Sequence, residues 1–383
     1  MKKVVGAALA LLGWWAPLAA QDRFSIDAER VAIYNLAGEV RLEAGTGSSV
    51  VVEMTRGGRD GDQLEVRRDQ ADGWQQLIVR YPSDRIVYDR LGRLSRNEFG
   101  VRQDGTFGLR DLDPQDGVER IKSERRPAPG SGDRVRVTGS GRGLAAYADL
   151  VVRVPRGRAV AVHLGAGKVF VSNVNGDVQI DARSAAIEAH DVSGFGRFDT
   201  GSGSILVNNA TGDFGLHTGS GSVVMKTMRR GGALVVNTGS GGVQVSNIEV
   251  GELDINTGSG RVTLNTIAAP IARVTTGSGG IRAHHFGTDN FDLHTGSGSV
   301  LAELTRDLQA GRIRTGSGSV QIALPVELGA EVTVDTGSGG IHPDGARIDV
   351  SESRRGFMRG TIGNGGGTLH ISTGSGGVSF RSY

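Results

Sequence analysis

The sequence predicts an all-β protein built as a single-stranded β-helix, or β-solenoid, with about 19 residues per turn. Three observations carry this prediction. Glycine supplies 62 of the 383 residues, a four-residue word recurs at a nearly fixed interval, and apolar residues keep fixed places around that word. A short period sustained along a chain is the signature of stacked repeats. Only nine prolines are present and there is no Gly-X-Y period, which excludes collagen.

The repeated word is Thr-Gly-Ser-Gly. Its first seven steps are 18, 20, 19, 19, 19, 20 and 21 residues, and the last interval is 37 residues, about two periods. Steps of 18 residues back from the first copy reach Ala182 and Leu164, where the surrounding pattern continues without the word. The intact copies in this register begin at Thr200, Thr218, Thr238, Thr257, Thr276, Thr295, Thr315, Thr336 and Thr373, and a further copy at Thr138 is out of register.

Apolar residues occupy two fixed columns around the word. One column lies two places before the threonine and runs from Val162 to Ile371, and the other lies five places after it and runs from Val169 to Val378. Alternation on both sides of the word predicts two short strands in each turn, and a weaker third apolar position suggests a third side. We expect both columns to point into the core.

The word itself has the composition of a corner between strands. Its glycines can adopt positive φ at no steric cost, and their lack of a side chain allows corners to stack closely. Successive turns lie about 4.8 Å apart, so each threonine should sit over the next and form a ladder of hydroxyls. We therefore interpret the word as a structural corner and not as a catalytic or binding site.

The N-terminus has the features of an export signal. Lys2 and Lys3 precede an apolar run from Val4 to Trp15, and small residues end it at Leu18–Ala20. We expect a signal peptide over residues 1–20, and a periplasmic, surface or secreted mature protein without a transmembrane segment. An uncleaved anchor is the alternative. The chain has no cysteine, so it can form neither a disulfide nor a lipoprotein anchor.

Three further regions follow the signal. Residues 21–83 contain alternating strand patterns, and we expect them to form an N-terminal β cap and the first strands. Residues 84–146 are expected to be a polar, charged and flexible insertion, because Asp84–Gly143 holds 13 basic and 10 acidic residues. The alternative is a loop that binds anions or lipid headgroups. The basic residues of that loop are Arg125, Arg126, Arg134 and Arg136.

Residues 147–383 form the predicted solenoid.

Charge and motifs exclude several functions. The chain has 43 basic and 41 acidic residues, and removal of Lys2 and Lys3 leaves 41 of each, so nothing draws it to nucleic acid. The corners lack the lysine and the following helix that a phosphate loop needs. They also lack the aspartates of calcium-binding β-rolls. No H-E-x-x-H or C-x-x-C motif occurs.

One polar column holds the best metal candidates. The residues directly before four successive corners are His163, Asp181, Asp199 and His217, and stacked imidazole and carboxylate groups could converge on a divalent metal. The simpler interpretation is that this column is the solvent-facing alternate of the strand. His284 and His285 are a weaker pair, expected to point to opposite faces. We expect no cofactor and no catalytic residue.

The chain resembles the bacterial putative-adhesin family of exported TGSG-repeat β-helix proteins, a domain of unknown function. The similarity rests on ADLVVRVPRGRAVAVHLGAGKVFVSNVNGDVQID, on the DTGSGSI series and on GNGGGTLHISTGSGGVSF, and covers residues 24–60 and 147–383. It implies a right-handed β-helix that is exported or displayed on the surface. It supplies no catalytic residues.

We therefore expect a non-enzymatic structural or binding module, adhesin-like, at the cell envelope. Its partner would be an unknown envelope protein or a polysaccharide. One alternative is a periplasmic partner of an envelope-stress or signalling system. Another is a polysaccharide-acting enzyme, which is disfavoured because such enzymes use aromatic platforms for sugars and Trp74 is the one tryptophan beyond the signal.

Overall fold

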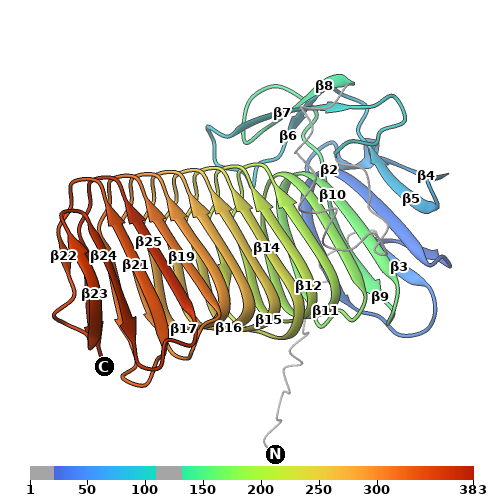
Figure 1. Ribbon diagram of the computed structural model, residues 1–383. Helices are drawn as coiled ribbons and strands as arrows, with labels where there is room; N and C mark the ends of the chain where they lie inside the picture. The colour runs from blue at the N-terminus through green and yellow to red at the C-terminus, as the bar shows by residue number, and fades with distance from the viewer. Residues whose placement is uncertain (1–20, 109–131) are drawn as a thin grey trace, which may run out of the picture.

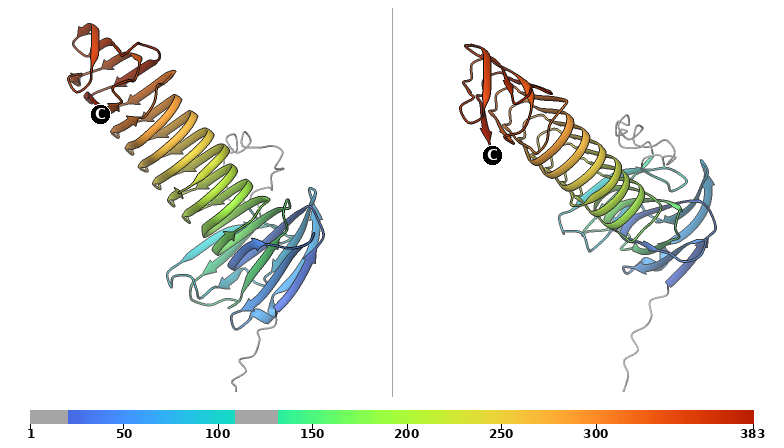
Figure 2. Two further views of the ribbon diagram at one scale, coloured as in Figure 1. Left: turned by 90° about the horizontal axis from the view of Figure 1, so that it is seen from below. Right: turned by 60° about the horizontal axis from the view of Figure 1, so that its bottom comes forward.

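The computed structural model describes residues 21–108 and 132–383 and shows an all-β rod of stacked coils (Figures 1 and 2). The predicted signal peptide, residues 1–20, lies outside the described residues. Within the described ranges the helical structure amounts to one 3-10 turn, η1 (Gly61–Gln63). No helix in this part of the chain has the length and apolarity needed to cross a membrane.

The coils are made of parallel strands that stack along the rod. Val243 pairs with Val262, and Val262 pairs with Ile281, so the pairing follows the spacing of the sequence repeat. The strands are β10 (Ala159–Ser172), β11 (Asp177–Thr200), β12 (Ile205–Thr218), β13 (Val223–Met225), β14 (Met228–Thr238), β15 (Val243–Thr257), β16 (Val262–Thr276), β17 (Ile281–Thr295), β18 (Val300–Leu304), β19 (Ala310–Thr315), β20 (Val320–Leu324), β21 (Ala330–Thr336) and β22 (Ile341–His342).

The two apolar columns form the core, as predicted. Every residue of the first column is buried, from Val162 to Ile371. The second column is buried as well, except for Ile341, which is half-buried because it lies in the last coil along the rod. Burial of one branched apolar side chain contributes roughly 1.5–3 kcal/mol, so these columns hold the coils together.

The corner threonines bond differently from the expected hydroxyl ladder. Thr276 Oγ1 donates to the carbonyl oxygen of Gly260 in the preceding coil at 3.0 Å, and it accepts from the amide of Gly279 at 3.1 Å. The same pair of bonds recurs at the corners that begin at Thr200, Thr218, Thr238, Thr257, Thr295 and Thr315. Each hydroxyl therefore links the backbones of two coils.

The corner glycines are required by close approach and not by positive φ. None of the glycines in the Thr-Gly-Ser-Gly words from Thr200 to Thr373 lies in the left-handed region. A Cβ added at Gly241 would lie 1.8 Å from the carbonyl oxygen of Gly221 in the preceding coil, and one at Gly260 would lie 1.8 Å from that of Gly241. Any side chain here would push neighbouring coils apart.

A different corner holds the left-handed residues. One residue in most coils has a φ of 51° to 61° there, and the first three are Asn173, Asp191 and Asn209. Asn and Asp tolerate this conformation better than other side chains do. The remaining members are Arg230, Asn247, Thr266 and His285.

The first coil of the rod is β2 (Arg30–Ala44), and additional strands cover its free edge at the N-terminal end. β2 stacks on β10, and its other edge pairs with β5 (Trp74–Arg80) and β9 (Tyr147–Val154). Antiparallel strands then cover these: β4 (Glu65–Ala71) on β5, and β3 (Val50–Gly57) followed by β1 (Gln21–Ile26) on β9. They protect the open edge of the first coil.

Part of segment 84–146, expected to be a flexible insertion, folds into a small separate sheet beside the first coils (Figure 1). Its strands are β6 (Arg85–Val87), β7 (Arg96–Val101) and β8 (Asp133–Thr138). Ile86, Phe99 and Val137 are buried in a cluster with residues of β2 and β10. Of the four arginines of the alternative anion-binding loop, Arg125 and Arg126 lie outside the described residues. Arg134 and Arg136 lie on β8, where Arg136 forms an ion pair with Glu98.

The C-terminal end departs from the order of the sequence. β25 (Thr368–Thr373) pairs with β19 on one side and β21 on the other, and β26 (Val378–Ser382) pairs with β20 and β22. The last coil of the chain therefore lies between the two coils that precede it. Antiparallel β24 (Phe357–Ile362) and β23 (Ile348–Arg354) then cover β21 and end the stack.

Candidate functional site

The four predicted metal candidates lie in one row, but not as an open site. Residue pairing sets His163 beside Asp181, and Asp199 beside His217. His163 Nδ1 lies 3.6 Å from Asp181 Oδ2, and the two side chains are only 2% and 6% exposed. Arg183 also reaches Asp181 Oδ2 at 3.6 Å. Among the residues that the structure describes, no group of three or more His, Asp or Glu is arranged to hold a metal ion.

The first pair is covered by Tyr34 of β2 and by the segment that follows β7 of the small sheet. The ring of Tyr34 stacks on His163 with centroids 4.3 Å apart, and Phe107 meets the same imidazole edge-on at 6.3 Å. A Cβ at Gly108 would lie 2.2 Å from Asp181 Oδ2. The expectation of a solvent-facing column does not hold for His163 and Asp181, because a long-range contact buries them.

His284 and His285 meet on one side of the rod. The left-handed φ of 51° at His285 breaks the alternation of the strand. Both imidazoles therefore approach Glu303, with His284 Nδ1 at 3.2 Å and His285 Nε2 at 4.0 Å from its carboxylate oxygens. The expected split across opposite faces is wrong for this reason.

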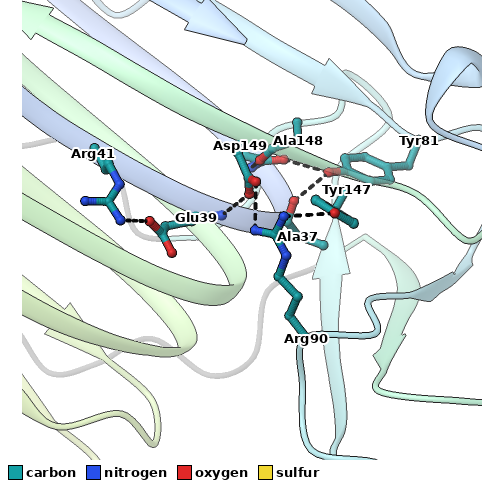
Figure 3. Close-up of polar contacts among 9 residues, drawn as sticks. Ala37, Glu39, Arg41, Tyr81, Arg90, Tyr147, Ala148 and Asp149 are labelled. Atoms are coloured by element: carbon teal, nitrogen blue, oxygen red, sulfur yellow. Dashed lines mark hydrogen bonds and ion pairs between the residues drawn. The ribbon is translucent and has the colours of Figure 1, made fainter. Parts of the chain in front are cut away.

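A polar cluster fastens the chain after β5 to β2 and to β9 (Figure 3). Tyr81 donates to the carbonyl oxygen of Ala37 at 2.9 Å, and Arg90 bonds Asp149 at 2.8 Å and the hydroxyl of Tyr147 at 2.9 Å. The guanidinium of Arg90 also lies over the Tyr147 ring, 4.5 Å from its centroid. Such paired contacts make this cluster a fastening rather than a reactive site.

Burial keeps the phenols of this region protonated. It raises the pKa of Tyr88 to about 12, and the negative charge of Asp149 adds to the effect. Burial also raises the pKa of Tyr81 well above its ordinary value. Both side chains therefore stay neutral over the physiological range and can donate hydrogen bonds.

The best candidate for binding is a charged face on the side of the rod. We define it by the outward row Asp254, Arg273, Asp292, Arg312 and His370, in which each residue pairs with the next across β15, β16, β17, β19 and β25. The sign of the charge alternates along the first four residues. Diagonal ion pairs bind Arg273 to Glu252 at 2.6 Å and Arg314 to Asp292 at 2.8 Å. Within the described chain Arg312 has no ion-pair partner.

A hollow of about 260 Å³ opens on the charged face. Its lining includes buried Phe291 and Gly311 and exposed Ala310, Arg312 and His370. The hollow exists because β19 carries two small residues at this level, while the ring of Phe291 fills the space under Gly311, where a Cβ would come within 2.5 Å of it. Ile271, 37% exposed, adds an apolar edge.

Polar atoms without hydrogen bonds lie beside this hollow. Within the described residues, Asp292 Oδ1 and His294 Nδ1 are buried atoms with no hydrogen-bond partner. Asp292 lines the hollow, and His294 is two positions further along the same strand. A buried acceptor without a partner costs about 1–3 kcal/mol, so a turn of the Asp292 carboxylate that brings this oxygen to a ligand donor in the hollow would recover free energy. No sequence pattern points to this site, because it is formed by residues of three separate coils and of the C-terminal strand β25.

Comparisons with known proteins identify the repeat region. A family model described as Toastrack DUF4097 matches residues 146–381. A crystal structure titled as a putative cell adhesion protein from Clostridium sporogenes ATCC 15579 aligns at 8% identity, with a TM-score of 0.19, over 95% of this chain and 99% of that one. No curated protein matches the sequence.

Proposed function

Because the chain belongs to the Toastrack DUF4097 family, we propose that it is a non-enzymatic, adhesin-like binding module that acts at the cell envelope. In this proposal the charged face of the solenoid contacts an envelope protein or polysaccharide. Export rests on the predicted signal peptide, residues 1–20, and leads to the periplasm or the cell surface.

The observation that carries the proposal is the charged face with its hollow. Arg312, without an ion-pair partner in the described chain, and His370 stand beside a small cavity, next to an acceptor oxygen of Asp292 that has no partner. An unpaired cation beside an unfilled acceptor can bind a ligand that offers both an acidic and a hydroxyl or amide group. Two ion pairs, Arg273 with Glu252 and Arg314 with Asp292, extend the charged surface around the hollow.

The same geometry supports binding more than catalysis. The Asp292 carboxylate is bonded to Arg314 and the Glu252 carboxylate to Arg273, so both carboxylates already hold a cation. A surface of many modest contacts is the kind that an extended polymer or a protein partner uses.

Finer features of the architecture belong to this proposal. We take the coil to be right-handed, with about 19 residues per turn, which the register from Val243 to Val262 and the family resemblance support. We also take residues 21–83 as the cap, 84–146 as the insertion and 147–383 as the solenoid domain.

The test is binding by the full exported chain to immobilised polygalacturonate, to neutral dextran and to envelope protein fractions. Arg312→Ala should weaken the binding that the wild type shows by roughly tenfold, about 1.4 kcal/mol. Arg282→Ala is the matched control, since it removes an exposed arginine from a different side of the same coils. Equal binding by the two variants would refute the charged face as the binding surface.

A separate experiment tests the absence of turnover. The chain is incubated with the same polysaccharides, with and without divalent metal, and products are analysed. We expect none. Product that appears with the wild type and disappears with Asp181→Asn, Asp199→Asn or His217→Ala would replace the binding module by an enzyme.

A further inference from the structure

The inserted coil, β25 and β26, lies between two coils that could also stack directly on each other. The neighbours are β19–β20 and β21–β22, and their threonines, Thr315 and Thr336, are 21 residues apart, one residue more than the longest step between consecutive coils elsewhere. The sequence spacing alone would stack these two coils directly. The structure instead places Thr373 between them.

The hydrogen bonds around the inserted coil are interchangeable with those of direct stacking. Gly374 N–H donates to Thr315 O at 3.1 Å, and Gly337 N–H donates to Thr373 O at 2.9 Å. Between consecutive coils, Gly316 N–H donates to Thr295 O at 3.2 Å in the same way. If the inserted coil left, Gly337 would face Thr315 with the donor and acceptor already matched.

The threonine bonds that link coils stop at the inserted coil. Thr315 Oγ1 donates to Gly298 O in the preceding coil at 3.0 Å. Thr373 Oγ1 donates instead to Gly376 O of its own corner at 2.5 Å, and Thr336 Oγ1 to Gly339 O at 2.7 Å. The two interfaces of the inserted coil therefore lack the side-chain link that most other corners have.

A displaced coil would still need a slot of the same kind. Its inward side chains, Leu369, Ile371, Val378 and Phe380, are buried between the neighbouring coils. Exposure of four such side chains to water is unfavourable, and the surface that matches them is the same slot in another molecule of this protein.

The connection to the inserted coil could lead either to the slot of its own rod or to the slot of a second rod. Residues 363–367, between β24 and β25, read Gly-Asn-Gly-Gly-Gly, and Gly363 and Gly365 have φ of 55° and 70°. Five residues can span about 17 Å when extended, which is enough to enter a second rod that lies beside the first with the two hinges facing each other. A glycine-rich hinge next to an exchangeable element is the arrangement in which domain swapping arises.

We propose that the slot between β19–β20 and β21–β22 also accepts the inserted coil of a second copy of this chain, so that two chains exchange β25 and β26 and pair side by side at their C-terminal ends. The exchange keeps every buried contact of the coil and changes only the path of the hinge. It leaves the charged-face residues of β15, β16, β17 and β19 on both rods in place, so a swapped pair would present two binding surfaces.

The test uses single cysteines, which are unambiguous because the natural chain has none. One chain carries Gln321→Cys and another carries Ser379→Cys, two positions that are paired across β20 and β26. Neighbouring strands lie about 4.8 Å apart, a separation that a disulfide can bridge. The two chains are unfolded together, refolded over a range of concentrations, oxidised and separated without reductant.

We expect a reducible heterodimer of the two chains whose fraction rises with protein concentration. Deletion of Gly365 and Gly366 should raise that fraction several-fold, because a shorter hinge disfavours the closed path. The fold control is the chain with both cysteines, which should cross-link within itself. If it does so and the mixed single-cysteine chains never form a heterodimer, the proposal is overturned.

The matched control replaces the second chain by one with Leu301→Cys, which pairs with Gln321 across consecutive coils, β18 and β20. These coils have no slot between them, so no heterodimer should form. A heterodimer from this pair as abundant as from the first would indicate general association of refolded chains and would also overturn the exchange.

Discussion

Thr276 and Gly260 are joined across two coils by a hydrogen bond of 3.0 Å, from the threonine hydroxyl to the glycine carbonyl oxygen. The bond explains why the corner contains threonine. A serine would offer the hydroxyl without the second branch that fixes χ1, and a valine would offer the shape without the donor. The repeated word is thus a device that ties the backbone of one coil to the next.

Thr276→Val should destabilise the central coils by about 1–3 kcal/mol, because it leaves the Gly260 carbonyl and the Gly279 amide without their partner. Denaturant unfolding and hydrogen exchange at the Gly279 amide measure the effect. Thr336→Val is the control, since Thr336 bonds only within its own corner. Equal losses for the two variants would show that the link between coils contributes nothing.

Thr266→Asn should stabilise the protein by roughly 0.5–1 kcal/mol. Thr266 has a φ of 57°, which is unfavourable for a β-branched residue, and asparagine takes this place in three other coils. Thermal unfolding checks the gain. Thr263→Asn, on a regular strand of the same coil, should bring no gain, and an equal gain there would refute the strain at Thr266.

Gly311→Ala should cost about 1–3 kcal/mol and alter the hollow of the charged face, because its Cβ would press on the Phe291 ring. Gly242→Ala is the comparison, since the nearest atom to its Cβ is 3.5 Å away. Melting temperatures and binding of the two variants are measured side by side. Retention of full stability by Gly311→Ala would mean that the ring of Phe291 moves freely.

Stability should fall between pH 10 and pH 12 as the buried phenols are titrated. Burial raises the pKa of Tyr88 from 10.0 to about 12 in the folded chain, so the unfolded chain loses its proton first. The stabilisation is complete below pH 10 and is lost as the pH rises to 12, by about 3 kcal/mol for this group. Urea unfolding at pH 8 to 12 should show a smaller loss for Tyr88→Phe than for the wild type.

Local pattern predicted the repeat and its core because strand alternation and corner spacing depend on neighbours in sequence. The columns that run from Val162 and from Val169 point inward as expected. The stacking order at the C-terminus could not be read in this way. An interval of 37 residues between Thr336 and Thr373 is compatible with two sequential turns, and only tertiary packing places Thr373 beside Thr315.

The candidate site was hidden for a similar reason. His163 and Asp181 have the sequence pattern of a polar column, but Phe107, more than 50 residues earlier, packs against His163. His285 departs from alternation because of its own backbone conformation. The hollow beside Arg312 depends on His370, which a purely sequential stack would place elsewhere.

The inserted coil has a mechanical consequence. In a stack that follows the sequence, tension on the final coil peels a single ladder of hydrogen bonds, one residue at a time. Here the segment that would take up a pull at the C-terminus is held by β19 and β20 on one side and by β21 and β22 on the other. Force applied there must shear two ladders of hydrogen bonds together. The rod therefore resists unravelling from this end more strongly than a rod with the same number of coils stacked in sequence order.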